Sequence, residues 1–162
     1  MAAKKKLIVR TPDQIIDDCE EVIKRMAYCL SVFDKTKEMS AQLLLCNTLV
    51  YSRSILELIS DDLRKSVGEI RFKPWKVAIN KSLKLHETFI ASNRNILLHQ
   101  GKLNIKRKSV TIKLGDKVPE SNYFLDLPNQ PIEFDKQDVH TICVSIYDTY
   151  KAFVKEARKQ FA

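Results

Sequence analysis

The chain has 162 residues, of which 44% are hydrophobic and 30% are charged. This length suits one domain better than two, and the apolar share is large enough for a buried core. No apolar run approaches the roughly 20 residues that span a bilayer, and the apolar stretch near the N-terminus is too short for a signal peptide. We therefore expect one soluble, cytoplasmic domain over residues 1–162, with no membrane contact.

Lysine and arginine outnumber the acidic residues by 28 to 20, which gives a net charge of +8. Such an excess favours association with polyanions, because binding releases their counterions. Nucleic acid is therefore a candidate partner, although charge alone specifies no particular one. The chain contains only three glycines. It has neither a P-loop nor a dinucleotide-binding glycine motif, so ATPase and Rossmann folds are excluded.

The four cysteines form no CxxC pair and have no histidine at zinc-ligand spacing beside them. Most lie among apolar neighbours in helical patterns, where cysteine behaves as a small hydrophobic residue. We expect core packing rather than disulfides, and we expect no metal and no cofactor. The four cysteines are Cys19, Cys29, Cys46 and Cys143.

Residues 1–10 form a basic lead-in, and a helix start follows at once. Thr11 is a predicted N-cap, Pro12 suits the first helical position, and Gln14 completes a capping box. The helix is predicted to run to about Asp34, with one apolar face at alternating spacings of three and four. That face consists of Ile15, Cys19, Val22, Met26, Leu30 and Phe33.

A second helix is predicted from about Glu38 to Val67, with Gly68 as its end. Its apolar residues cover more than one face, which is typical of a central helix in a bundle. The stretch from Glu69 to Pro74 interrupts the pattern. A third helix is then expected from about Trp75 to Gly101.

Residues 103–130 are predicted to form a small β-hairpin or loop insert. The alternating segment 110–114 indicates a strand, Gly115 and Asp116 offer a turn, and 123–125 indicates a returning strand. Asp135 is then the predicted cap of the last helix. We expect one apolar side there, made by Val139, Ile142, Cys143, Ile146, Tyr150, Phe153, Val154 and Ala157. The predicted fold is therefore all-α, a four-helix bundle with this insert before the last helix.

One segment carries a distinctive chemical pattern, Arg94-Asn95-Ile96-Leu97-Leu98-His99, at the end of the third predicted helix. It resembles the motif of the HEPN superfamily (higher eukaryotes and prokaryotes nucleotide-binding): arginine, a polar residue, a few further positions, then histidine. The resemblance implies a HEPN-like helical bundle that is commonly a homodimer. Many members are metal-independent ribonucleases of toxin–antitoxin, antiviral defence or stress systems, and others bind nucleotides or act as non-catalytic partners.

Elementary chemistry independently supports a catalytic role for these residues. Histidine titrates near neutrality, so His99 can serve as general base or acid toward an RNA 2′-hydroxyl. Arginine presents a charged planar fork to phosphate oxygens, so Arg94 can stabilise the transition state. Asn95 can orient either of them. The resemblance implies products that end in a 2′,3′-cyclic phosphate.

Helical geometry constrains this site. Five residues place Arg94 and His99 about 140° apart around a regular α-helix, whereas Asn95 and His99 share a face. Either the helix loosens before Gly101, or two subunits complete one cleft around a two-fold axis. We favour the dimer.

The densest basic stretch follows the motif directly and comprises Lys102, Lys106, Arg107 and Lys108. These residues are candidate RNA-backbone contacts. The alternative is a solvated hairpin whose lysines protect an exposed strand edge from aggregation. Arg94 and His99 likewise have a structural alternative, a surface ion pair and a polar helix end.

Two other histidines are assigned structural roles. His86 lies on the apolar side of the third predicted helix and is expected in or near the core. His140 begins the last helix with Asp135 and Asp138 nearby, and capping explains this group better than metal binding does.

The leading hypothesis is a metal-independent endoribonuclease of the HEPN type that acts on RNA as a homodimer. An antitoxin or another protein is a possible partner of such a ribonuclease. The first alternative is a non-catalytic helical module that binds a protein partner or a nucleotide. The second is a basic nucleic-acid-binding domain that cuts nothing. RNA turnover separates the first hypothesis from both alternatives.

Overall fold

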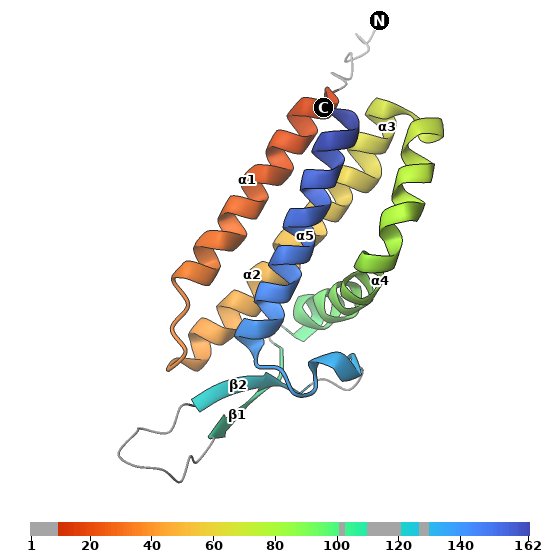
Figure 1. The fold of residues 1–162 in the computed structure, drawn as a ribbon. Helices are drawn as coiled ribbons and strands as arrows, with labels where there is room; N and C mark the ends of the chain where they lie inside the picture. Colours follow the sequence, from red (N-terminus) through yellow and green to blue (C-terminus); the bar gives the residue numbers. More distant parts are fainter. Residues whose placement is uncertain (1–9, 101–102, 110–120, 127–129) are drawn as a thin grey trace, which may run out of the picture.

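The computed structural model describes residues 10–100, 103–109, 121–126 and 130–162. At 81, 82, 85, 94, 96–100, 109 and 121 it describes the backbone alone. Four long helical segments stand side by side in the described part of the chain, and a two-stranded sheet lies at one end of them (Figure 1). The all-α prediction with a small hairpin is therefore confirmed at this level.

Helix α1 spans Pro12–Ser31 and starts with the predicted capping box. The Gln14 backbone N–H donates to Thr11 Oγ1 at 3.3 Å, and the Thr11 N–H donates to the Gln14 side chain at 3.0 Å. The helix ends before the predicted Asp34, because the Asp34 carboxylate accepts the backbone and hydroxyl hydrogens of Thr36 and forms a turn. These bonds lower the pKa of Asp34 to about 2.

The predicted second helix is one continuous rod with an irregular turn inside it. Helix α2 spans Glu38–Glu57, a π-helical turn η1 spans Leu58–Leu63, and α3 spans Arg64–Val67. Gly68 ends the rod as predicted, with φ of 84° and ψ of 150°. The π-helical turn was not predicted from the sequence.

By length and apolar composition the span Glu38–Val67 could cross a membrane. Core helices of soluble proteins share this property, and α2 packs against α1, α4 and α5. Inward leucines and isoleucines of α2 and η1 are fully buried, as expected for a central bundle helix. They include Leu45, Leu49, Ile55, Ile59 and Leu63.

The predicted break between Glu69 and Pro74 is wrong, because α4 spans Glu69–Gln100 without interruption and contains Pro74. Proline removes one backbone donor, and here the deprived carbonyl belongs to Ile70, which is 93% exposed. Water can therefore satisfy that carbonyl, so helix continuity costs little. Figure 1 shows α4 changing direction midway, so that its second half crosses toward α2.

The insert contains strands β1 (Ile105–Ser109) and β2 (Ser121–Leu125), paired antiparallel with Ile105 opposite Leu125. The returning strand at 123–125 is confirmed. The predicted strand at 110–114 and the turn at Gly115 and Asp116 lie outside the described residues.

Asp138, not Asp135, caps helix α5 (Val139–Phe161) by accepting the Thr141 backbone N–H at 2.8 Å. Asp135 instead ends a short 3₁₀ turn η2 (Ile132–Phe134), and its carboxylate accepts from the Gln130 amide at 2.6 Å. The predicted apolar side of α5 is confirmed, because all eight of its residues are buried.

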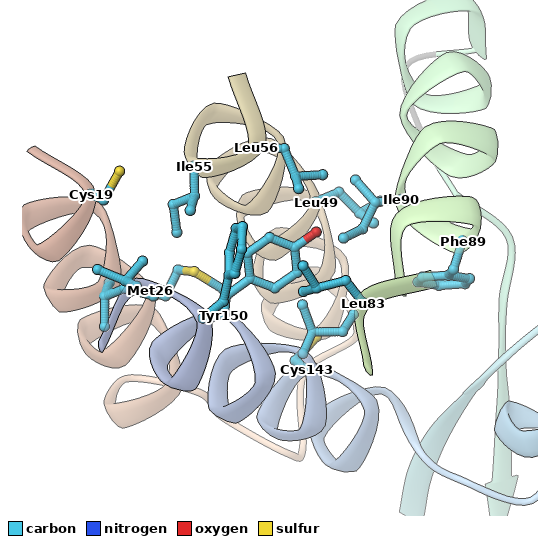
Figure 2. Close-up of a cluster of buried hydrophobic side chains, with 14 of the residues drawn as sticks. Cys19, Met26, Leu49, Ile55, Leu56, Leu83, Phe89, Ile90, Cys143 and Tyr150 are labelled. Atoms are coloured by element: carbon cyan, nitrogen blue, oxygen red, sulfur yellow. The ribbon is translucent and has the colours of Figure 1, made fainter. Parts of the chain in front are cut away.

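The core lies where α1, α2, α4 and α5 meet around Tyr150 (Figure 2). Cys19 and Cys143 are buried in it, and burial raises the pKa of each thiol to about 12. All four cysteines are free thiols. The core assignment is therefore confirmed for Cys19 and Cys143, whereas Cys29 and Cys46 are half-buried beside it.

We predict that Gly68→Ala lowers the free energy of unfolding by about 1–3 kcal/mol, because φ of 84° with ψ of 150° is a region that only glycine adopts easily. A Cβ at this position would meet no atom within 4 Å, so the cost is conformational rather than steric. Urea unfolding measures it, with Ser92→Ala on the exposed face of α4 as control. Equal stability of the two variants would contradict the prediction.

Candidate functional site

The segment with Arg94, Asn95 and His99 belongs to the second half of α4, which the structure shows as α-helical through Gln100. The less favoured of the two alternatives, a loosening of the helix before Gly101, is therefore not found. Positions 94 and 99 stay about 140° apart around the helix. The side chain of Asn95 is exposed, and those of Arg94 and His99 lie outside the described part of the structure.

Asn93 anchors this segment and was not singled out from the sequence. Its side chain is 3% exposed, and its amide donates to the Phe89 carbonyl at 2.8 Å. The Phe89 ring meets Phe134 edge to face at 4.9 Å between centroids. A buried amide and an aromatic pair therefore fix the helix immediately before position 94.

The predicted RNA-binding residues of the insert lie on β1, except Lys102, which lies outside the described residues. Lys106, Arg107 and Lys108 are all exposed. Lys106 pairs with Asp126 at 2.7 Å, and the Lys108 ammonium lies 4.7 Å from the centre of the Phe124 ring. Two of these three cations therefore have partners within the hairpin, which fits the protective role, while their exposure leaves them accessible to phosphate.

The two remaining histidines occupy structural positions. His86 is 7% exposed, as predicted for a core histidine, and its Nε2 lies 3.5 Å from Ser145 Oγ. His140 stacks on Phe33, with 5.0 Å between the ring centroids. Among the described residues, no three histidine, cysteine or acidic side chains gather as a metal site would require.

A polar groove of about 370 Å³ lies between the α2–η1 rod and α4, and we call it the α2–α4 groove. It exists because α4 bends. Lys76 Nζ donates to Glu87 Oε1 at 2.9 Å, although eleven residues separate them along one helix. A straight α-helix would place them about 16 Å apart, beyond the reach of both side chains. The groove is lined by Arg53, Leu56, Glu57, Ser60, Asp61, Lys76, Glu87 and Ala91.

Two unsatisfied hydroxyls lie in the core beside this groove. Tyr150 and Ser52 are both 0% exposed, and neither hydroxyl has a hydrogen-bond partner among the described residues. Figure 2 shows the Tyr150 oxygen between α2 and α4, among Leu49, Leu56 and Ile90. Burial raises the pKa of Tyr150, and the Glu87 carboxylate raises it further. The phenol is therefore a neutral donor without an acceptor.

The groove lies on the same side of α4 as the candidate catalytic segment. Helical positions 94 and 99 fall about 60° and 80° to either side of Ala91, one to two turns further along. The Gln42 side chain donates to the Leu103 carbonyl at 2.7 Å, which ties the chain just after α4 to the start of α2. The segment 94–99 therefore runs alongside α2.

The outward face of α2 carries an apolar stripe of Met39, Leu43 and Val50, which are 69%, 55% and 47% exposed. The spacings of four and seven residues keep them on one helical face. Exposed apolar residues in such a row are typical of an interaction surface. We call this the outer α2 stripe.

The sequence pattern did not indicate the groove. Arg53 and Glu57 pair at 2.8 Å and resemble an ordinary surface pair four residues apart. Lys76 and Glu87 come together only through the bend. Comparison with protein-family models, curated proteins and solved structures gives no match to this chain.

We predict that Tyr150→Phe leaves the free energy of unfolding unchanged or raises it by up to about 2 kcal/mol, because a buried hydroxyl without a partner destabilises the fold. The matched control is Tyr123→Phe. The Tyr123 hydroxyl donates to the Thr36 carbonyl at 3.5 Å, so its removal should cost about 0.5–1 kcal/mol. A loss above about 1 kcal/mol for Tyr150→Phe, measured by urea unfolding, would contradict the prediction.

Proposed function

We propose that this chain is a metal-independent endoribonuclease of the HEPN type. The observation that carries the proposal is that the motif of Arg94, Asn95 and His99 falls on one unbroken helical segment, in the last two turns of α4, beyond the α2–α4 groove. The helical bundle with net charge +8 and the exposed cations of β1 support it. RNA is the proposed substrate, and the cell-biological role is in toxin–antitoxin, defence or stress systems.

The proposed reaction is transfer of the RNA phosphate to the neighbouring 2′-hydroxyl. The 2′-oxygen attacks phosphorus and loses its proton to a histidine, while the bond from phosphorus to the 5′-oxygen breaks. A protonated histidine returns a proton to that leaving oxygen. The products are a 2′,3′-cyclic phosphate and a free 5′-hydroxyl. The arginine stabilises charge on the non-bridging oxygens, and no metal takes part.

The helix geometry supports a site shared by two subunits. Because α4 stays helical through Gln100, positions 94 and 99 of one chain diverge around the helix. A two-fold axis along this face would bring position 94 of one subunit near position 99 of the other. The outer α2 stripe supplies exposed apolar surface for such a contact.

The alternative is a helical module that binds nucleotide or a protein partner without cutting RNA. The outer α2 stripe favours it equally, because an apolar helix face serves a different protein as well as a second copy. The alternative differs from the main proposal in a simple way, since it predicts association without RNA turnover.

The catalytic proposal predicts that the purified protein cuts labelled RNA in the presence of EDTA. His99→Ala should lower the rate by at least about 100-fold, because it removes the general acid–base group. Arg94→Ala should do the same by removing transition-state charge stabilisation. The control is His140→Ala, which removes an imidazole at the start of α5 and should retain activity. The absence of cleavage, or equal rates in His99→Ala and wild type, would refute the catalytic role.

The dimer proposal predicts that Leu43→Glu weakens self-association at least about tenfold, because it puts a charge in the centre of an apolar contact. RNA cleavage should fall in parallel. Ile70→Glu is the matched control, because Ile70 is also highly exposed but lies at the far end of α4. Sedimentation velocity over a concentration series measures the self-association of both variants. A wild-type protein that remains monomeric while it cuts RNA would contradict the shared site.

A further inference from the structure

The α2–α4 groove offers a carboxylate and an ammonium side by side. Glu87 and Lys76 meet at 2.9 Å on the inner side of the bend, and their side chains are 30% and 21% exposed. Both are therefore held in place by the fold yet open to the groove. Arg53 and Glu57 form a second such pair on the opposite wall, at 2.8 Å.

This pattern matches the hydrogen-bonding edge of one nucleobase. Guanine presents two adjacent donors, N1–H and the N2 amino group, next to the acceptor O6. A carboxylate accepts from both donors at once, and a neighbouring cation donates to O6. Uracil has one donor between two acceptors. Adenine and cytosine place a donor next to an acceptor, so neither fits a bidentate carboxylate.

The buried phenol is a second unusual feature beside the groove. The Tyr150 hydroxyl lies in the core among Leu49, Leu56 and Ile90, behind the groove lining, and it has no partner among the described residues (Figure 2). A buried donor without an acceptor is rare in folded proteins, and such groups often mark functional sites. The π-helical turn that forms part of the same wall through Ser60 and Asp61 is a second such feature.

We propose that the α2–α4 groove binds the guanine base of an RNA nucleotide, with Glu87 accepting from N1–H and N2–H and Lys76 donating to O6. This inference rests on the proposed ribonuclease function and assigns its substrate preference. A base seated over Ala91 leaves its phosphate about 4–12 Å further along α4, at the level of positions 94–99. Cleavage is therefore directed to bonds next to guanosine.

The first test is equilibrium binding of GMP, AMP, CMP and UMP to the full chain. GMP should bind at least about tenfold more tightly than the other three. Glu87→Gln should abolish this preference, because an amide accepts only one of the two hydrogen bonds. Equal affinity for all four nucleotides would overturn the proposal.

Two variants that add a bulky side chain, one inside the groove and one outside it, test where GMP binds. Ala91→Leu fills the groove from an exposed helix position and should lower GMP affinity at least about tenfold. Ser92→Leu adds the same side chain one residue later, outside the groove lining, and should bind GMP as the wild type does. Thermal melts confirm that both are folded. Equal effects of the two variants would refute this location.

Mapping of cleavage sites separates this inference from the proposed function. Cuts next to guanosine in the wild type, shifted or lost in Glu87→Gln, would support both. RNA cleavage without guanosine preference, together with no selective GMP binding, would overturn the groove assignment and leave the ribonuclease standing. Selective GMP binding that persists in His99→Ala without any RNA cleavage by the wild type would support the groove and overturn the ribonuclease.

Discussion

Lys76 and Glu87 belong to one helix, yet their charged groups meet at 2.9 Å, which only a bent helix permits. The two halves of α4 pack against different parts of the molecule. The first half contacts α5 through Trp75, which stacks on Phe153 at 5.4 Å. The second half is fixed by Leu83, Phe89 and Ile90 in the core beside α2. The bend makes both contacts possible and opens the α2–α4 groove on its inner side.

Local sequence signals account for the elements that were predicted well. The capping box at Thr11 and the apolar period of α5 both depend on residues three or four positions apart in the chain. Neighbouring residues therefore suffice to identify them. The break predicted at Pro74 follows from the general rule that proline is disfavoured inside helices. Here Ile70, whose carbonyl loses its partner, is on the surface, and only the structure reveals that exposure.

The candidate site likewise contains some residues that the sequence identifies and others that only the structure brings together. The residues Arg94, Asn95 and His99 form a motif within one helix, so sequence alone identifies them. The groove depends on Arg53, Lys76 and Glu87, which three-dimensional packing brings together across a bend and a neighbouring helix. No spacing rule for a straight helix predicts a pair eleven residues apart. Likewise, the burial of the Tyr150 hydroxyl follows from packing, since the sequence pattern marks only an apolar position.

Locally unfavourable features of the structure near the α2–α4 groove support a functional role for it. Stable folds usually satisfy buried polar groups and keep helices regular. In the described part of this chain, several departures lie near the α2–α4 groove: the π-helical turn Leu58–Leu63, the unpartnered hydroxyls of Ser52 and Tyr150, and a half-buried ion pair across a bend. Others lie elsewhere, at the side-chain oxygens of Gln42 and Gln130. An apolar contact between α2 and α4 would fill the same space more cheaply. A ligand with hydrogen-bonding groups could bind the charged pair in the groove, one to two helical turns before the candidate catalytic segment.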